Sequence, residues 1–384
     1  MNNKAVISNY GGISLGDPKD TNDFKFFTYE QLPKFTDKHQ SLLSKILTKK
    51  LFEKLKDKKT KTGFSFSNVI QSGIECPTLD LGVVAGDEES YSLFKDLFYK
   101  IIKQWHDFDP ISRKHISDVD IKKINLNEFN SLDLDKYIIS TRISSIRNIS
   151  GYPLPAGTTN QVRKDTEEVL KKIFQKFKRN FSGEYYSIDN LSKTDLKNLQ
   201  KKEYVFKDPH PDSLLLKSGA SRNWPNSRGV FSDDDHTILC WCNRKDHCSI
   251  ISLQDGYNIK KTFENFCALS DAFSNNITAI SKTIMQSETL GYLSTSPNNL
   301  GTGIKASVKI KLPKLTKNRD ILNKLCTKNY LEIKNAKWKG TISFGNVLDL
   351  ANKRNLGITE VELLQNFVNG VIEIIQAEEK MWHF

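Results

Sequence analysis

Apolar side chains recur every three to four residues in the first part of the chain, a spacing that is typical of amphipathic helices. One such run extends from Leu42 to Leu55, with lysines on the opposite face, and a second extends from Tyr91 to Trp105. Each run predicts a helix, and together they predict a small, mostly helical domain. The segment from Asp107 to Asp135 is polar and rich in Asp, Asn and Lys, so we expect a linker there.

The pattern changes beyond the linker, where short strand-like runs alternate with longer helical ones. Residues 304–312 alternate apolar and polar side chains, which predicts a half-buried strand. The pair Thr359 and Glu362 has the spacing of a capping box at the start of a helix. The other predicted strands and helices cover residues 237–242, 249–253, 166–177 and 363–375. The second domain is therefore expected to combine a sheet with helices.

Length and composition are those of a globular protein. At 384 residues the chain can form two cores, and 38% of its residues are hydrophobic. No apolar run approaches the roughly 18 residues of a membrane-spanning helix, and the N-terminus lacks a secretory signal. We therefore expect a cytoplasmic protein with no membrane contact. Residues 1–23 have little hydrophobic spacing, which predicts an extended arm.

The net charge of +12 raises the question of an acidic partner. One interpretation is a solvated basic surface with no special partner, and the other is a surface that binds nucleic acid, anionic lipid or an acidic protein. The basic residues are spread through the predicted helices, and no nucleic-acid-binding module is visible. Among partners we therefore favour an acidic protein surface and expect no nucleic acid.

The cysteine pattern does not predict a metal site. Cys240 and Cys242 lie in a strand-like run, but no second pair is available to complete four ligands. We expect reduced thiols and no bound metal.

One stretch carries a specific resemblance. Residues 296–314 read S-P-N-N-L-G-T-G-I-K-A-S-V-K-I-K-L-P-K. This resembles the signature C-P-T-N-L-G-T-x-x-R-A-S-V-H-I-K-L-P of the phosphagen (guanidino) kinases, and arginine kinases most of all. Further matches follow in family order at Ser140-Thr141-Arg142, Trp224-Pro225, Asn243-x-x-Asp246-His247 and Asn352-Lys353-Arg354. Everything after about the first 35 residues is covered.

The resemblance implies an α+β fold: a small all-helical N-terminal domain followed by a larger domain with an antiparallel sheet flanked by helices. The implied boundaries are an N-terminal extension at 1–35, the helical domain at 36–118, a linker at 119–135 and the catalytic-type domain at 136–384.

In this family, arginines hold the phosphates of ATP, and their planar groups suit that task better than lysine does. By the resemblance Arg142 is retained, whereas Ser144 and Ser249 stand where arginine is expected. Lys305 and Lys334 are the weaker replacements for two more arginines. On the adenine side, Lys309 and Glu203 stand where the family has histidines, and one family histidine is kept as His247.

The side that would hold the guanidino substrate departs further. The two family glutamates fall at Lys245 and Lys339, and the family cysteine falls at Ser296. Two like charges about 4 Å apart repel by roughly 4 kcal/mol at an effective dielectric near 20. With Ser249 also changed, the site is expected to be degenerate, with no catalytic residue left. The sequence thus predicts an inactive pseudoenzyme that acts as a structural or interaction subunit.

Alternatives stay open at this point. The first alternative to a pseudoenzyme is an active phosphotransferase with a rebuilt site. The second is a nucleotide sensor that binds but does not transfer. No cofactor is expected. The cleft either binds ATP or ADP weakly or is a remnant of the scaffold that binds no nucleotide. The residual contacts for phosphate or nucleotide are Arg142, His247, Lys305, Lys309 and Lys334.

A partner contact is predicted at Lys337, Trp338 and Lys339, where an aromatic side chain lies between lysines. The alternative is that Trp338 fills the vacated pocket. By analogy with phosphagen kinases that supply ATP along cilia and flagella, the expected location is the cytoplasm, with the cilium or axoneme as a specific case. Tubulin, whose tails are acidic, or another axonemal protein would then be the partner.

Overall fold

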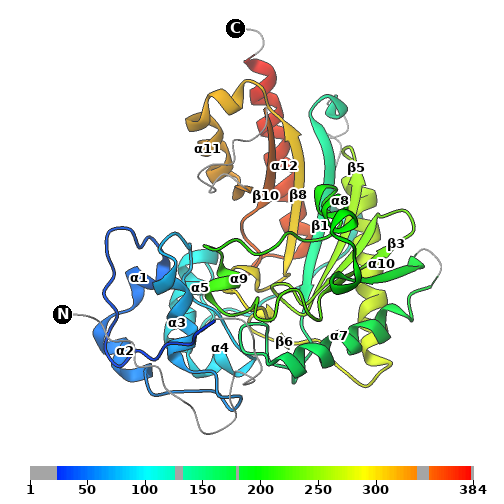
Figure 1. Cartoon of the computed structure of the whole chain (residues 1–384). Helices are drawn as coiled ribbons and strands as arrows, with labels where there is room; N and C mark the ends of the chain where they lie inside the picture. Colours follow the sequence, from blue (N-terminus) through cyan, green and yellow to red (C-terminus); the bar gives the residue numbers. More distant parts are fainter. Residues whose placement is uncertain (1–23, 126–132, 179–180, 335–345, 382–384) are drawn as a thin grey trace.

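The computed structural model describes residues 24–125, 133–178, 181–334 and 346–381. Figure 1 shows a helical part, in blue and cyan, beside a larger part built on a long, twisted sheet. The predicted α+β architecture, a helical domain followed by an antiparallel sheet with helices, is confirmed. Within the described ranges, no helix is both long and apolar enough to cross a bilayer.

The helical part contains five short helices, and the run predicted as one helix from Leu42 to Leu55 is two. Leu47 leaves the helical conformation, and the Thr48 side chain then caps the next helix by accepting a hydrogen bond from the Leu51 amide. The second predicted helix is likewise divided, at Phe94. The helices are α1 (Leu42–Ile46), α2 (Lys49–Leu55), α3 (Phe66–Glu75), α4 (Glu89–Leu93) and α5 (Lys95–His106).

Aromatic side chains fill the core of the helical part. Phe52, Phe66, Phe94 and Phe98 are fully buried and come from different turns of the apolar stripes. Burying each contributes roughly 1.5–3 kcal/mol. This core continues into side chains of the second part, such as Leu293. The two parts therefore pack directly on one another.

The sheet has eight antiparallel strands in the order β2-β3-β4-β5-β1-β8-β10-β9. The strands are β1 (Ile138–Arg147), β2 (Gly183–Ser187), β3 (Gly229–Asp233), β4 (Ile238–Cys242), β5 (Cys248–Asp255), β8 (Ile304–Lys311), β9 (Leu331–Lys334) and β10 (Val347–Asn352). A separate two-stranded sheet pairs β6 (Gln286–Ser287) with β7 (Gly291–Tyr292). The remaining α-helices are α7 (Asn160–Phe174), α8 (Lys193–Lys201), α9 (Leu214–Lys217), α10 (Ile259–Thr278), α11 (Arg319–Lys328) and α12 (Glu360–Lys380).

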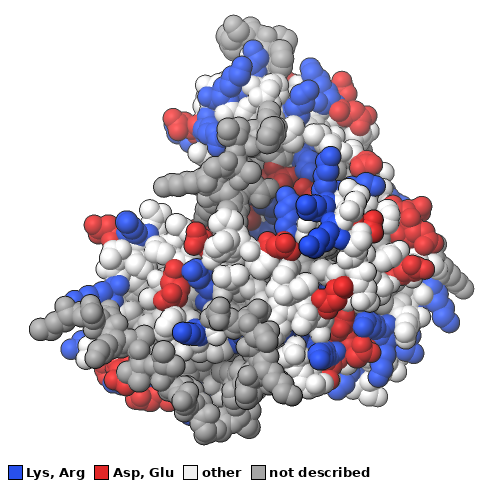
Figure 2. All heavy atoms as spheres, viewed as in Figure 1, with Lys and Arg blue, Asp and Glu red and all other residues white. Residues whose placement is uncertain are grey.

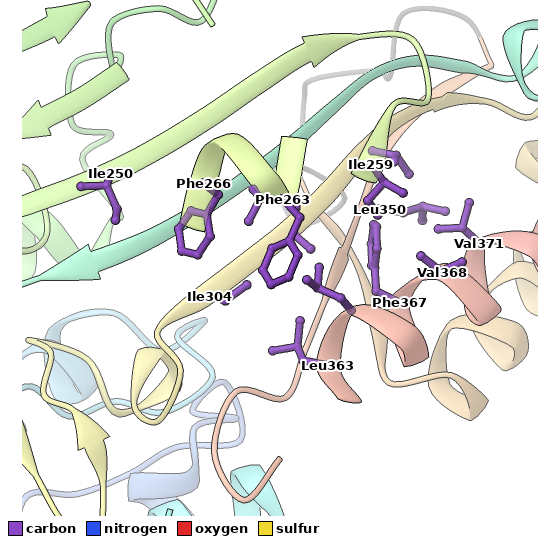
Figure 3. Packing of buried hydrophobic residues seen from close by; sticks show 14 of the residues in the cluster. Ile250, Ile259, Phe263, Phe266, Ile304, Leu350, Leu363, Phe367, Val368 and Val371 are labelled. Carbon is purple, nitrogen blue, oxygen red and sulfur yellow. The ribbon is translucent and has the colours of Figure 1, made fainter. Parts of the chain in front are cut away.

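One face of the sheet is covered by helices α7, α10 and α12. Figure 3 shows Phe263 and Phe266 of α10 and Phe367 of α12 packed against strand residues such as Ile304 and Leu350. The capping box at the start of α12 is confirmed, because the Thr359 and Glu362 side chains each accept a backbone hydrogen bond from the other residue. This apolar layer fixes the strands that carry the site on their opposite face.

Two segments expected to lie outside the packed body are attached to it. In the polar segment from Asp107 to Asp135, Ser117 and the Asp118 amide donate to the buried carboxylate of Glu360, at the start of α12. In the N-terminal extension, the amides of Phe27 and Tyr29 donate to side chains of α3. The structure thus describes residues 24–35 as part of the packed body.

Candidate functional site

The predicted phosphate-side residues meet on the face of the sheet opposite α7, α10 and α12. Over β3, β4 and β5 this face is itself covered by an apolar cluster that includes side chains of α8, and the charged residues lie beside that cluster, on β1, β8, β10 and β9. Lys309 of β8 is the cross-strand partner of Asp349 in β10, which is in turn the partner of Lys334 in β9. Lys305 is the partner of Ser144 in the same way, and Arg142 lies two residues before Ser144 on β1. Cross-strand partners point to the same side of a sheet. Their strand neighbours on the other side, such as Val308 and Leu350, belong to the helix-covered core.

The loop between β4 and β5 adds two more cations. The Arg244 guanidinium carbon lies 5.0 Å from the centre of the Trp241 ring, and that of Arg142 lies 4.5 Å from the same ring. Such contacts contribute about 0.5–1 kcal/mol each, and more when water is excluded. Lys245 follows directly and interacts electrostatically with Arg244 and Lys305. Figure 2 shows lysine and arginine side chains, with some acidic ones, gathered in a hollow over the sheet.

Two of these cations are neutralised by carboxylates. Lys305 Nζ lies 2.9 Å from Glu332 Oε1 and also donates to the Asn352 carbonyl at 2.7 Å. Lys309 Nζ lies 3.2 Å from Glu203 Oε1. Burial alone would raise the pKa of Glu332, but the attraction of Lys305 leaves that pKa below its usual value. These lysines are thus partly occupied by the protein itself.

Four other cations have no ion pair with a carboxylate among the described residues: Arg142, Arg244, Lys245 and Lys334. Burial, followed by repulsion from Lys305 and Arg142, lowers the pKa of Lys334 to about 7. Burial also lowers the pKa of Arg244, and the charge of Arg142 lowers it further. The pKa of Lys245 shifts in the same direction. Because the Lys245 side chain is exposed, the surrounding water screens part of that effect.

The pocket beside Lys245 offers no free carboxylate. Ser296 and Thr295 line it together with α9 and the residues that follow, and its volume is about 10 Å³. That space holds about one water molecule. Asp246 also lines it, but its oxygens accept hydrogen bonds from Asn148 Nδ2, Ser294 Oγ and the Thr295 amide. Lys245 and Asp246 are the charged residues that line this pocket, and Lys245 has no ion pair among the described residues.

His247 has a structural role in this arrangement. Its Nδ1 accepts a hydrogen bond from the Ile149 amide at 3.0 Å, and its Nε2 donates to the Pro153 carbonyl at 2.9 Å. Burial lowers the pKa of His247 to about 4, so the ring is neutral at pH 7. With both ring nitrogens bonded to the backbone, neither is available to a nucleotide.

The two serines at family arginine positions cannot replace the missing charges. Ser144 Oγ donates to the Lys305 carbonyl at 3.3 Å, and Ser249 lies opposite Trp241 across the β4–β5 pair. A hydroxyl carries no charge and offers one donor where an arginine offers five. The predicted contact residues Lys337, Trp338 and Lys339 lie outside the described residues.

Sequence reasoning missed several residues of the cleft. Arg244 belongs to the same motif as Lys245, and a check of every charge in that motif would have found it. Trp241 lies on the same face as Ser249, which the strand register shows. Glu332 and Asp349 were missed because β9 and β10 are short and were not predicted as strands.

Comparison with known proteins agrees with this architecture. Residues 37–103 match the family "ATP:guanido phosphotransferase, N-terminal domain", and residues 165–381 match "ATP:guanido phosphotransferase, C-terminal catalytic domain". Creatine kinase M-type from Gallus gallus is 35% identical over 365 residues, which cover 93% of each chain. The same protein from Canis lupus familiaris is 35% identical over 357 residues, or 92% of each chain.

Solved structures extend the match to other members. A crystal structure of lombricine kinase superposes with a TM-score of 0.81 at 30% identity and covers 91% of this chain and 95% of that one. The duplicated taurocyamine kinase from Schistosoma mansoni gives a TM-score of 0.82 at 27% identity, covering 90% of this chain and 47% of that one. On its sequence and its fold, the chain belongs to the phosphagen kinase (ATP:guanidino phosphotransferase) family.

Proposed function

We propose that this phosphagen kinase homologue does not transfer a phosphoryl group to a guanidino acceptor and acts instead as a structural or interaction subunit. The observation that carries the proposal is Lys245. It supplies a positive charge to the pocket next to Ser296, and the only carboxylate lining that described pocket, Asp246, is held by three donors. Because that pocket holds only about one water molecule, a guanidino substrate would lie beside it, where its positive charge would be repelled by Lys245.

The size of the effect supports this proposal. Repulsion between two charges about 4 Å apart is roughly 4 kcal/mol at an effective dielectric near 20. Losing one preorganised charge-stabilising group typically costs a factor of about 10²–10³ in rate. Ser144 and Ser249 supply no charge where the family resemblance expects arginine, and Lys305 is already bonded to Glu332. Several such losses together leave little catalysis.

The test is an assay of ADP formation by the purified full-length chain. Arginine, creatine, lombricine and taurocyamine should be tried separately with ATP, and an active taurocyamine or creatine kinase should be run in parallel. We expect no acceptor-dependent ADP. Turnover at ordinary kinase rates, roughly 1–100 s⁻¹, would overturn the proposal.

A second candidate is an active kinase with a rebuilt site. The names of the relatives support it, because they are kinases of creatine, lombricine and taurocyamine. Glu332 and Asp349 also approach the cleft, and the structure places both near Lys334. Glu332, however, is held by Lys305. If the protein is active, Glu332→Gln and Asp349→Asn should abolish that activity.

A third candidate is a sensor that binds ATP or ADP without transfer. Calorimetry with each nucleotide, in the absence of any acceptor, separates it from the first. Binding of ATP together with a complete absence of transfer would favour the sensor.

For the interaction role, we propose an acidic protein surface as the partner, with the acidic tails of tubulin in the cytoplasm or axoneme as the specific case. The net charge of +12 supports this. Binding to microtubules should weaken steeply between low salt and 0.3 M salt, because exposed charges are screened beyond about 10 Å at 0.1 M. Deleting residues 1–23 removes arm sequence without removing the packed segment that begins at Phe24. Binding that ignores both changes would remove the support for this partner.

A further inference from the structure

The cleft holds more positive charge than its own carboxylates neutralise. Among the described residues, its cations are Arg142, Arg244, Lys245, Lys305, Lys309 and Lys334, and its carboxylates are Glu203, Asp246, Glu332 and Asp349. Two of the lysines are paired with glutamates at 2.9 and 3.2 Å. Six cations against four carboxylates leave a formal excess of two positive charges, and the four cations without an ion pair in the described part of the chain are Arg142, Arg244, Lys245 and Lys334.

Arg244 and Lys245 lie on the side of the cleft away from the β9 edge. Arg244 is positioned by its contact with Trp241, and its Nε is buried with no hydrogen-bond partner in the structure. Such a donor lacks a bond that an oxyanion would supply. Lys245 extends from the next position and lines the pocket with Ser296. These two side chains thus offer one guanidinium and one ammonium to the same region.

Arg142 and Lys334, the other two cations without an ion pair among the described residues, continue this positive field, and Asp349 attracts both of them. Arg142 lies against the same Trp241 ring as Arg244, and the two guanidinium groups are close enough for the charge of Arg142 to disfavour protonation of Arg244. Lys334 interacts in turn with Arg142 and Lys305. Like charges held together in this way repel one another, and a bound anion would relieve that repulsion.

We infer that Arg244 and Lys245 form an anion subsite and that, together with Arg142 and Lys334, they bind a chain of linked phosphates across the cleft. This inference rests on the proposed function, because it places an anion on the side where an active relative would hold a guanidinium. Arginine forks suit tetrahedral oxyanions, and lysine supplies three more donors. Linked phosphates carry several charges within a few ångströms, which matches four cations in one cleft better than the widely spaced carboxylates of a peptide.

The direct test is calorimetric titration of the full-length chain with inorganic tripolyphosphate at 50 mM salt. We compare the wild type with the double variant Arg244→Gln/Lys245→Gln, which keeps the side-chain length and removes both charges. The matched control is Lys260→Gln, an exposed lysine on α10, which covers the other face of the sheet. We expect one site in the wild type, at least a tenfold loss of affinity in the double variant, and wild-type affinity in the control.

Further arms separate the sources of the ligand and guard against misfolding. ATP tests the same phosphate chain when it carries a base, and tri-glutamate tests a carboxylate ligand. The single variant Arg244→Lys changes the same position but keeps its positive charge. It should therefore keep most of the tripolyphosphate affinity that the double variant loses. Intrinsic fluorescence gives an independent readout, because tripolyphosphate should change the emission of Trp241 and the change should disappear in Trp241→Phe.

The outcomes are decisive in both directions. Equal tripolyphosphate affinity in wild type and double variant, equal losses in the double variant and the Lys260→Gln control, or preference for tri-glutamate would each overturn the inference. If the inference fails while no guanidino acceptor is phosphorylated, the proposed function still stands. If the wild type phosphorylates an acceptor but the double variant loses tripolyphosphate binding, the proposed function fails and the anion subsite stands.

Discussion

The two faces of the eight-stranded sheet differ although the same strands build both. On the covered face, Ile143, Val308 and Leu350 pack with the helices and are buried. On the opposite face, which is packed with α8 over β3 to β5 and is called the open face where it carries the cleft, the neighbouring positions hold Arg142, Lys309 and Asp349. Apolar burial on the covered face stabilises the fold, so charges on the open face can change without loss of the architecture.

The same contrast appears within five residues of the β4–β5 loop. Asn243, Asp246 and His247 are buried and hydrogen-bonded to neighbouring segments. Arg244 and Lys245 lie between them and face the cleft. A family resemblance carried by the buried members of a motif therefore identifies the fold, whereas the members that face the cleft decide the chemistry.

The largest effect is expected on the covered face. Phe367→Ala removes a buried ring between α12 and the sheet, and large-to-small changes of this kind cost about 3–5 kcal/mol. Chemical denaturation measures the free energy of unfolding. As the open-face counterpart, Lys334→Ala should cost far less. Equal losses for the two variants would break the comparison between the faces.

A smaller but clear difference is expected within the β4–β5 loop. Asp246→Ala leaves the donors of Asn148, Ser294 and Thr295 without their acceptor, and an unsatisfied buried donor costs about 1–3 kcal/mol. Lys245→Gln should change the free energy of unfolding by no more than about 0.5 kcal/mol. Thermal and chemical unfolding of both variants provide the measurement. A larger loss for Lys245→Gln than for Asp246→Ala would contradict the division of this motif.

Protonation of Lys334 gives a pH-dependent prediction. Its pKa in the folded chain is about 7, below the ordinary value of 10.5. Between these values the unfolded chain binds more protons at this residue, so its contribution to stability rises as the pH rises from about 7 towards 10. The charged groups that act on it are Lys305, Arg142, Glu332 and Asp349.

The measurement is the difference between wild type and Lys334→Gln, since other groups titrate in the same range. The rise of stability with pH should be smaller in Lys334→Gln. Tripolyphosphate affinity of the wild type should fall over the same range, because the anion prefers the protonated amine. Identical pH profiles of stability for the two proteins would show that Lys334 has an ordinary pKa.

The smallest effect on stability is expected at the pair of Lys305 and Glu332. Both side chains are partly exposed, and such pairs contribute about 0–1 kcal/mol. Glu332→Gln should therefore change unfolding little, but it should increase the affinity for tripolyphosphate by releasing Lys305. Unchanged or lower affinity would mean that Lys305 does not act on the bound anion.

The sequence predicted the covered half of the molecule better than the cleft. The alternation of residues 304–312 gave β8, and the stripe of residues 363–375 gave α12, because periodic burial leaves a direct trace in the chain. The break at Thr48 was missed because the apolar spacing continues across it. The position of Lys245 beside Ser296 depends on contacts between residues 51 positions apart, and local patterns do not encode such contacts.

Phosphorus NMR of the full-length chain with ATP and each guanidino acceptor tests the central claim most directly, because it observes the phosphoryl group itself. The account predicts that ATP is not converted to ADP and that no phosphoguanidino signal appears for arginine, creatine, lombricine or taurocyamine. An active creatine kinase in a parallel tube should produce the creatine product. Formation of any phosphoguanidino product by this chain at about 1 s⁻¹ or faster would contradict the claim that Lys245 and its neighbours have ended the transfer reaction.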